Sequence, residues 1–257
     1  MSNAIKVIKN KYQWGFPAIL MIGLLFLAAA PQPDSITVYL VGDSTMSNKE
    51  VEAYPETGWG MPFPVFFNST VTVENHARNG RSTRTFLEEG RWEPIVSNLK
   101  EGDYVFVQFA HNDEVPTKEQ YTPPKQYQAN LRKYVTETRD KGARPVLLTP
   151  IARRHFDDQG HLKDTHAQYS ELMRQVAKEL EVPLIDLDKK SQALLKDLGP
   201  EKSVFLYNHL EPGQHPNYQE GIEDNTHFSE YGARRMAELA LEGMRELELE
   251  LTERVVD

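Results

Sequence analysis

Cysteine is absent from the 257-residue sequence, which excludes disulfide bridges and thiolate metal sites. The Gly-x-Ser-x-Gly motif is also absent. That motif carries the nucleophile of α/β-hydrolases, so its absence argues against that fold. No His-Glu-x-x-His or similarly compact metal-binding motif occurs either. The sequence therefore carries neither of these two common hydrolase signatures.

Acidic residues are missing from the first thirty positions, where the sequence has the layout of a secretory signal peptide. Lys6, Lys9 and Lys11 precede a mostly apolar, uncharged run of 15 residues at 16–30, which ends on three alanines. Such a run is too short to span a bilayer comfortably and ends on residues that a signal peptidase accepts. We therefore predict a signal peptide at 1–30 and an exported protein, periplasmic or secreted. An uncleaved membrane anchor is the alternative.

The rest of the chain, 31–257, is predicted to be a single domain that does not associate with the membrane after cleavage. The whole sequence has 38 acidic and 29 basic residues, a formal net charge of −9. Loss of the three lysines of the signal peptide takes this charge to −12. An acidic surface argues against nucleic acid as a partner.

Strand-like and helix-like segments alternate along the predicted domain. Short runs of β-branched, aromatic and aliphatic residues are typical of buried strands, and the amphipathic segments between them are typical of helices. This alternation predicts parallel strands with helices on both faces of one sheet. The predicted strands are 36–41, 71–74, 104–110, 145–149 and 182–186, and the predicted helices are 59–67, 85–99, 125–141, 165–180 and 229–251.

Polar clusters follow the first three predicted strands, and another precedes the last predicted helix. Ligands of such sheets bind beyond the carboxyl ends of the strands, so we expect these clusters to converge at one edge. Asp43 lies beside a tight turn and is expected to cap backbone N–H groups. The clusters are Gly42-Asp43-Ser44-Thr45, residues 75–82, His111-Asn112-Asp113 and residues 224–227.

A serine hydroxyl needs a base, and a histidine base needs an acceptor at its second ring nitrogen. Ser44 is the predicted nucleophile, His227 the base and Asp224 the group that orients it. Positions three apart face the same side of a tight turn or helix start, so one segment could supply both Asp224 and His227. The predicted oxyanion-hole donors are the N–H groups of Ser44 and Gly80 and the side-chain amide of Asn112.

Four blocks of the sequence together resemble the SGNH (GDSL-type) hydrolases. They are Gly42-Asp43-Ser44-Thr45, Gly80, His111-Asn112-Asp113 and Asp224-x-x-His227. The closer similarity is to the rhamnogalacturonan acetylesterase branch, through residues 38–46, Gly58-Trp59-Gly60 and Asn79-Gly80-Arg81-Ser82. The similarity extends over about 36–240.

This resemblance implies a flavodoxin-like three-layer α/β sandwich, with a five-stranded parallel sheet and helices on both faces. It also implies a Ser-Asp-His triad, no metal or other cofactor, and removal of O-acetyl groups from an oligo- or polysaccharide, most of all a pectic one such as rhamnogalacturonan. The sequence departs from the family at Ala110, where relatives often have glycine, and at 208–221, an insertion-like loop. This loop leaves the sugar open.

The sequence leaves three other functions open. A lipase- or thioesterase-like enzyme of the same family would need an apolar acyl groove. A carbohydrate-binding module could stack sugars on Trp59, Trp92 and Tyr218. A metal-dependent hydrolase could use His209, His215, Asp224 and His227 as ligands.

Arginines cluster around Gly80 in this otherwise acidic chain. A guanidinium suits the geometry of a carboxylate, so Arg78 and Arg84 are predicted to bind a uronate of the substrate. Arg81 is expected instead to brace the loop that carries Gly80. A purely structural role for all of these arginines is the alternative.

Overall fold

The parallel sheet has the strand order β2-β1-β3-β4-β5 in the computed structural model, which describes residues 35–256. The order reverses at β1, whose neighbours are β2 and β3. A crevice opens at the carboxyl ends of the strands where the order reverses, and it is the usual ligand site of such folds. The strands are β1 (Ile36–Gly42), β2 (Val71–Asn75), β3 (Tyr104–Gln108), β4 (Arg144–Leu148) and β5 (Leu184–Ile185).

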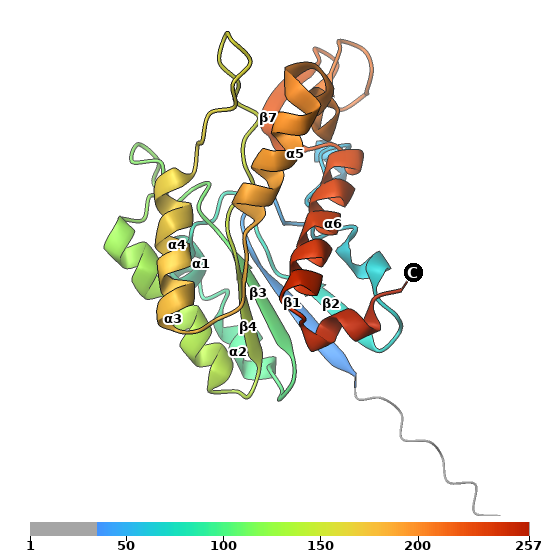
Figure 1. Cartoon of the computed structure of the whole chain (residues 1–257). Helices are drawn as coiled ribbons and strands as arrows, with labels where there is room; N and C mark the ends of the chain where they lie inside the picture. Colours follow the sequence, from blue (N-terminus) through green and yellow to red (C-terminus); the bar gives the residue numbers. More distant parts are fainter. Residues whose placement is uncertain (1–34, 257) are drawn as a thin grey trace, which may run out of the picture. The chain divides into compact units, whose positions relative to one another are not determined.

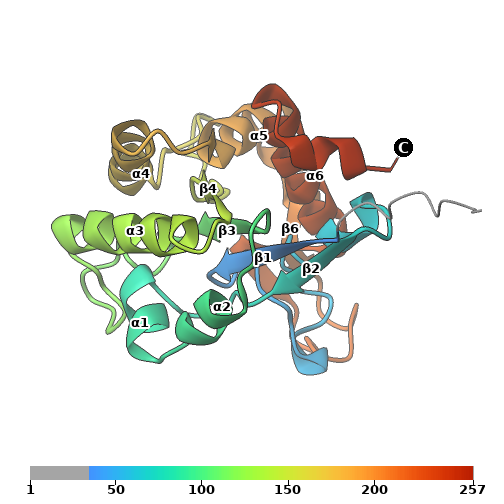
Figure 2. The ribbon, with the colours of Figure 1, turned by 90° about the horizontal axis from the view of Figure 1, so that it is seen from below.

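Helices cover both faces of this sheet (Figures 1 and 2), so the predicted three-layer α/β sandwich is confirmed. One face is covered by α1 (Thr83–Glu88), α2 (Glu93–Asn98), α3 (Pro124–Arg139) and α4 (Ala167–Glu179). The other face is covered by α5 (Leu187–Lys202) and α6 (Glu230–Glu246). Short 3-10 helices lie at η1 (Val51–Ala53), η2 (Phe63–Phe66), η3 (Ser203–Leu206) and η4 (Glu250–Arg254).

Successive residues of β1 belong to two different hydrophobic cores. Val38 and Leu40 pack with α5 and α6, whereas Tyr39 and Val41 pack with the helices on the opposite face. Side chains alternate between the faces of a strand, so a strand buried on both faces must be apolar throughout. This requirement is why the central strands were recognisable as short apolar runs.

The helices differ from the sequence prediction in three places. The single helix predicted at 85–99 is wrong, because the chain turns at Gly90 (φ +66°) and divides it into α1 and α2. The helix predicted at 59–67 is only the 3-10 helix η2. Helix α5 was not predicted, because Gly199 and Pro200 interrupt its pattern and such a pair normally ends a helix.

The loop expected at 208–221 is mostly the connection of an antiparallel hairpin, whose first strand takes up its first three residues. Its strands are β6 (Tyr207–Leu210) and β7 (Ile222–Phe228). The connecting segment is tied to the chain around η1, because the amide of Asn217 donates to the carbonyl of Val51 at 2.7 Å and the hydroxyl of Tyr218 donates to that of Ala53 at 2.8 Å. The hairpin therefore packs against the part of the chain that leads to Glu56.

Two of the aromatic residues considered for sugar stacking lie in the interior. Trp59 is fully buried and Trp92 is 1% exposed. The indole N–H of Trp59 donates to Gln108 at 2.6 Å, and that of Trp92 donates to Glu137 at 2.6 Å. Both side chains are therefore part of the folded core, and neither offers a ring face to a sugar.

Residues 35–256 form one compact unit. The predicted signal peptide at 1–30 lies outside the described residues. Across 35–256, none of the helices is both long and apolar enough to cross a membrane.

Candidate active site

The side chain of Ser44 lies at a pocket of about 440 Å³, just beyond the carboxyl end of β1. Segments that are far apart in the sequence converge here, and every residue that lines the pocket is polar or glycine. They are Ser44, Glu56, Asn79, Gly80, His111, Asn112, Lys118, Arg153, Thr226 and His227. The four clusters expected at one edge of the sheet thus all contribute to one pocket.

Two hydrogen bonds connect Ser44, His227 and Asp224 in a row. Nδ1–H of His227 donates to Oδ2 of Asp224 at 2.7 Å, and the hydroxyl of Ser44 donates to Nε2 of His227 at 2.8 Å. The ionised carboxylate can only accept, so it fixes the proton of the imidazole on Nδ1 and leaves the lone pair of Nε2 toward Ser44. Nε2 is therefore placed to take the proton of the Ser44 hydroxyl.

Asp224 is held in its ionised form. Burial alone would raise the pKa of this carboxyl, but hydrogen bonds and charge from His227 and the N–H groups of Thr226 and His227 lower it to about 2. The side chain remains 20% exposed, and that of His227 is 27% exposed. The carboxylate is therefore available to orient the imidazole and to stabilise its protonated form.

Asp224 and His227 come from strand β7, and not from the tight turn or helix start considered from the sequence. A regular strand would direct residues three apart to opposite faces. Here Oδ1 of Asp224 accepts the N–H of Thr226 at 2.6 Å and that of His227 at 2.9 Å. These local bonds accompany a bend that brings the carboxylate of Asp224 to the ring of His227, and that ring reaches Ser44. The last helix, α6, begins only at Glu230.

The pocket has N–H groups that are free to donate hydrogen bonds to an oxyanion. Within 35–256, the backbone N–H groups of Ser44 and Gly80 have no acceptor. Gly80 has φ +75°, a conformation that other residues rarely adopt. Asn112 uses one amide hydrogen to donate to the carbonyl of Arg81 at 3.0 Å, which leaves the second free. All three predicted donors thus belong to residues that line the pocket.

A buried lysine connects the loops that carry Ser44 and Gly80, and sequence reasoning missed it. The ammonium of Lys49, 1% exposed, donates to the carbonyl of Ser44 at 2.6 Å and to Oδ1 of Asn79 at 2.9 Å. It also pairs with Glu56 at 2.6 Å. Burial lowers the pKa of Lys49, and Glu56 partly offsets this. No local pattern marks Lys49, since the contact that joins the two loops is with Asn79, 30 positions away.

The buried carboxyls of Asp43 and Asp113 accept hydrogen bonds that hold the loops of the site in place. Oδ1 of Asp43 accepts the N–H of Thr45 at 3.0 Å, as expected for a turn-capping residue. Oδ1 of Asp113 accepts the N–H of Thr83 at 2.9 Å and so ties the start of α1 to the 111–113 block. Burial raises the pKa of both carboxyls, that of Asp113 to about 7. Each also accepts from the hydroxyl of the same threonine, so both serve the shape of the site.

The arginines around Gly80 lie away from the lining of the pocket. Arg78 is exposed, with its nearest carboxylate, Glu50, at 3.9 Å. Arg84 pairs with Glu88 at 2.5 Å and donates to two backbone carbonyls of the 119–121 segment. Arg81 donates to the carbonyl of Asn79 at 2.8 Å and so braces the Gly80 loop. A uronate-binding role for Arg78 and Arg84 stays a prediction.

One group of side chains could in principle hold a metal ion among residues 35–256: Glu56, Asp224 and His227, whose ligand atoms lie within 4.8 Å of one another. Each already has a partner, because Glu56 pairs with Lys49 and Asp224 with His227. The histidines considered as further ligands lie elsewhere: His209 bonds to Asn225 at 3.0 Å, and His215 packs against Tyr54.

Residues 40–235 match the sequence model of the GDSL-like Lipase/Acylhydrolase family. The chain is 44% identical over 221 residues to rhamnogalacturonan acetylesterase RhgT of Bacillus subtilis, covering 86% of this chain and 94% of that protein. It is 39% identical to the probable rhamnogalacturonan acetylesterase YesY of the same organism, covering 85% and 97%.

The fold is also similar to a solved structure. The crystal structure of protein YxiM from Bacillus subtilis superposes with a TM-score of 0.72 at 28% sequence identity. The match covers 86% of this chain and 60% of the longer YxiM chain.

Proposed function

The chain belongs to the GDSL-like lipase/acylhydrolase family, and we propose that it is a serine esterase that removes O-acetyl groups from a pectic polysaccharide such as rhamnogalacturonan. The observation that carries this proposal is the hydrogen-bonded row of Ser44, His227 and Asp224 at the pocket. The names of the two similar relatives support the acetyl group and the sugar.

The lining of the pocket supports an acetyl ester over a long-chain ester. A lipase or thioesterase must bury an apolar acyl chain, and each buried methylene contributes about 0.8 kcal/mol. Among the described residues, no aliphatic, phenyl, phenol or indole side chain lines this pocket. Its polar groups instead suit a small acyl group on a hydroxyl-rich alcohol.

The chemistry then runs in two stages. The Ser44 hydroxyl attacks the acetyl carbonyl while Nε2 of His227 takes the hydroxyl proton, and Asp224 stabilises the imidazolium that forms. His227 returns this proton to the sugar oxygen as the bond to the acetyl group breaks. A water then attacks the acetyl-Ser44 ester with His227 again as base, and acetate leaves as Ser44 regains its proton.

Negative charge develops on the acetyl oxygen during each attack. The N–H groups of Ser44 and Gly80 and the amide of Asn112 are the proposed donors to this oxygen. The bonds from Asn112 to Arg81 and from Lys49 to Ser44 and Asn79 hold these groups in place before the substrate arrives. Such fixed donors need no rearrangement when the charge appears.

Asn112→Ala should lower kcat on the order of 10²-fold with little change in KM, because the amide acts mainly in the transition state. Steady-state kinetics on p-nitrophenyl acetate measure both constants, and circular dichroism verifies the fold. A change in KM alone would make Asn112 a substrate-binding residue instead.

Release of acetate from acetylated rhamnogalacturonan is the test of the proposed function. We expect acetate release, a strong preference for p-nitrophenyl acetate over the octanoate ester, and no loss of activity with EDTA. Preference for the longer ester would favour a lipase-like enzyme. Inactivation by EDTA that added metal reverses would favour a metal-dependent hydrolase.

Export of the protein is a further part of this proposal. A polysaccharide of plant cell walls lies outside the cell, which agrees with a signal peptide at 1–30. Mass spectrometry of the protein recovered from culture fluid or periplasm tests this, since cleavage after residue 30 removes Lys6, Lys9 and Lys11. A mature protein that still begins at Met1 would contradict it.

A further inference from the structure

Two basic side chains, Lys118 and Arg153, line the pocket that holds Ser44. The charge of Arg153 is already matched, because its guanidinium donates to Glu114 at 2.8 Å and to the carbonyl of His111 at 3.2 Å. Both side chains of that ion pair are largely buried, at 17% and 11% exposed. The guanidinium of Arg153 therefore has a structural role in the pocket lining.

Lys118 differs from Arg153 in having no acidic partner. Its side chain is exposed, and no carboxylate within 35–256 comes within ion-pairing distance of it. Its ammonium lies 3.4 Å from Oδ1 of Asn112, so it lies close to the proposed oxyanion donors. An ammonium has three donors, and this long contact leaves the others free for a ligand.

Glu56, the acidic side chain on the described lining of the pocket, does not cancel the charge of Lys118. Glu56 pairs with the buried Lys49 at 2.6 Å. With Arg153 matched by Glu114 and Glu56 by Lys49, Lys118 is the basic side chain on the described lining of the pocket that has no acidic partner. Because its side chain is exposed, salt screens its attraction for a charged substrate.

The loop that carries Lys118 is held rigidly. The N–H of Lys118 donates to the carbonyl of Val115 at 3.0 Å, and its own carbonyl accepts from Tyr121 at 3.0 Å. Arg84 donates to the carbonyls of Glu119 and Tyr121. Arg84, predicted from the sequence to touch the substrate, thus braces the segment that presents Lys118.

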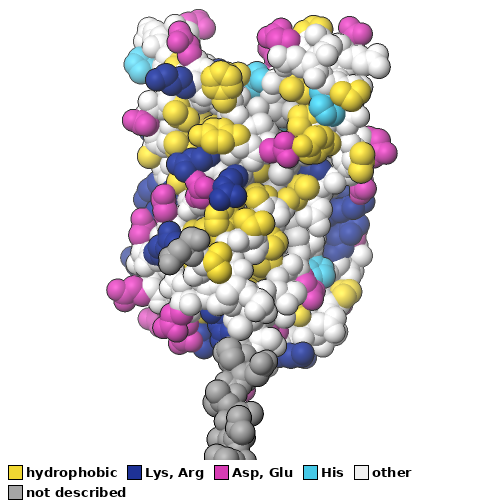
Figure 3. Space-filling model, turned by 90° about the vertical axis from the view of Figure 1, so that its right-hand side faces the viewer, with side chains coloured by type: hydrophobic (Ala, Val, Ile, Leu, Met, Phe, Trp, Pro, Cys, Tyr) yellow, Lys and Arg dark blue, Asp and Glu magenta, His cyan; other side chains and the backbone are white. Residues whose placement is uncertain are grey.

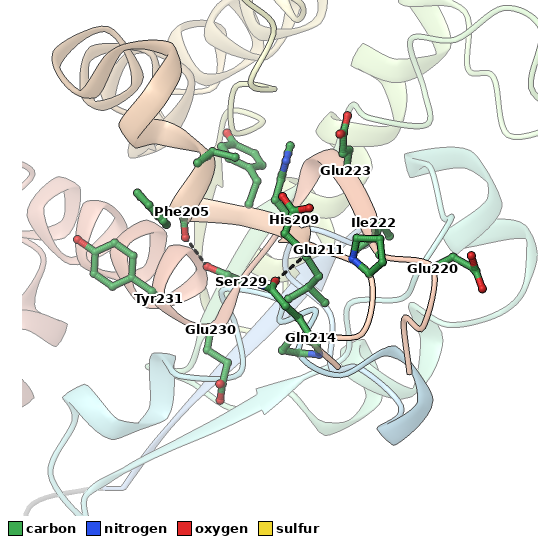
Figure 4. A pocket seen from close by; sticks show the side chains of 16 residues that line it. Phe205, His209, Glu211, Gln214, Glu220, Ile222, Glu223, Ser229, Glu230 and Tyr231 are labelled. Atoms are coloured by element: carbon green, nitrogen blue, oxygen red, sulfur yellow. Dashed lines mark hydrogen bonds between the residues drawn. The ribbon is translucent and has the colours of Figure 1, made fainter. Parts of the chain in front are cut away.

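A second, larger cavity has the opposite charge. It has a volume of about 1080 Å³ and lies beside the β6–β7 hairpin (Figure 4). Its lining has no lysine or arginine but has four glutamates, Glu211, Glu220, Glu223 and Glu230. A substrate with carboxylates would therefore be attracted to the Ser44 pocket and repelled by the cavity at the hairpin. On the face that Figure 3 displays, by comparison, basic and acidic side chains are interspersed.

We propose that Lys118 binds a carboxylate of the substrate, so that the pocket selects acetyl esters on acidic sugars over those on neutral ones. This inference rests on the proposed esterase function and adds a residue that determines its specificity. The carboxylate of a uronate next to the acetylated sugar accepts hydrogen bonds from the ammonium of Lys118. These bonds take the place of hydrogen bonds from the ammonium to solvent.

The test compares one oligosaccharide in two forms. An acetylated rhamnogalacturonan oligosaccharide is used with free uronate carboxylates and after methyl esterification of those carboxylates, and kcat/KM for acetate release is measured on each. The wild-type enzyme should prefer the acidic form, and Lys118→Met should lower the ratio of the two constants about tenfold. Taking the ratio cancels any effect of Lys118 that passes through Asn112.

Two further variants act as controls. Lys118→Arg keeps the charge and should keep most of the preference. Lys196→Met removes an equal charge from α5, away from the pocket, and should leave the ratio unchanged. Added salt should weaken the preference of the wild-type enzyme.

An unchanged ratio in Lys118→Met, with or without a loss shared by both substrates, would overturn the proposal. Equal activity of the wild-type enzyme on both forms would overturn it as well. If the wild-type enzyme released acetate from neither form, the proposed function itself would fail, which is a distinct result.

Discussion

Ser44→Ala should lower kcat by about 10³-fold or more while the protein remains folded. Alanine removes the oxygen that attacks the acetyl carbonyl, and no other hydroxyl replaces it. Among the described residues that line the pocket, Thr226 has the other hydroxyl, and it makes no hydrogen bond to the ring of His227. The activity that remains comes from the oxyanion donors and from binding alone.

The measurement is kcat on p-nitrophenyl acetate for both proteins, prepared in parallel so that traces of wild-type enzyme are excluded. Ser97→Ala is a useful control, because Ser97 lies in α2, away from the pocket, and its hydroxyl donates to the carbonyl of Glu93 at 2.8 Å. Near-full activity of a folded Ser44→Ala protein would refute the catalytic assignment.

Asp224→Asn should lower kcat by about 10⁴-fold, which is the effect of the same change in a serine protease triad. An amide can donate a hydrogen to Nδ1 of His227, and the imidazole then carries its proton on Nε2, where it can no longer accept from Ser44. The amide also carries no charge to stabilise the imidazolium. Glu223→Gln is the matched control, since Glu223 lies next in the same strand and outside the pocket of Ser44.

The expected signature is a loss in kcat with little change in KM, and the loss should diminish at high pH, where hydroxide replaces the base. If Asp224→Asn kept more than about a tenth of the wild-type activity, the aspartate would be a structural residue of β7 only.

The same variant tests a linked effect on stability. The folded-state pKa of Asp224, about 2, lies below its ordinary value of 3.8. Its ionised form therefore stabilises the fold above the ordinary pKa, and this contribution is lost as the pH falls through that value toward 2. The free energies of unfolding of the wild type and Asp224→Asn should converge over this interval by on the order of 1 kcal/mol, allowing for screening of a partly exposed group. A constant difference would contradict this.

Much of the sheet could be predicted from the sequence because burial on both faces leaves a local signal. Tyr104–Gln108 is buried at every position, so it had to be a continuous apolar and aromatic run. Strand β7 gave no such signal. Between its apolar ends, Ile222 and Phe228, the strand is polar and not fully buried, and its partner β6 lies across the connecting segment 211–221, which carries no short turn signal for a hairpin.

The site was predictable to the extent that its residues follow strands directly. Ser44 and Asn112 come after β1 and β3, and the topology alone brings those positions to one edge of the sheet. The roles of Lys49, Glu56 and Lys118 could not be predicted, because each depends on contacts between loops whose paths the sequence does not specify. The same reason explains Arg84, whose guanidinium turns toward a carbonyl 37 positions away in the chain.

If Ser44 is the nucleophile, a fluorophosphonate probe should label it. Such probes react with a serine only when a neighbouring base activates it. Peptide mapping by mass spectrometry should find one phosphonylated residue, Ser44, with loss of activity in proportion to labelling and no labelling in His227→Ala. Labelling at another residue, or full inactivation with Ser44 unmodified, would contradict the account.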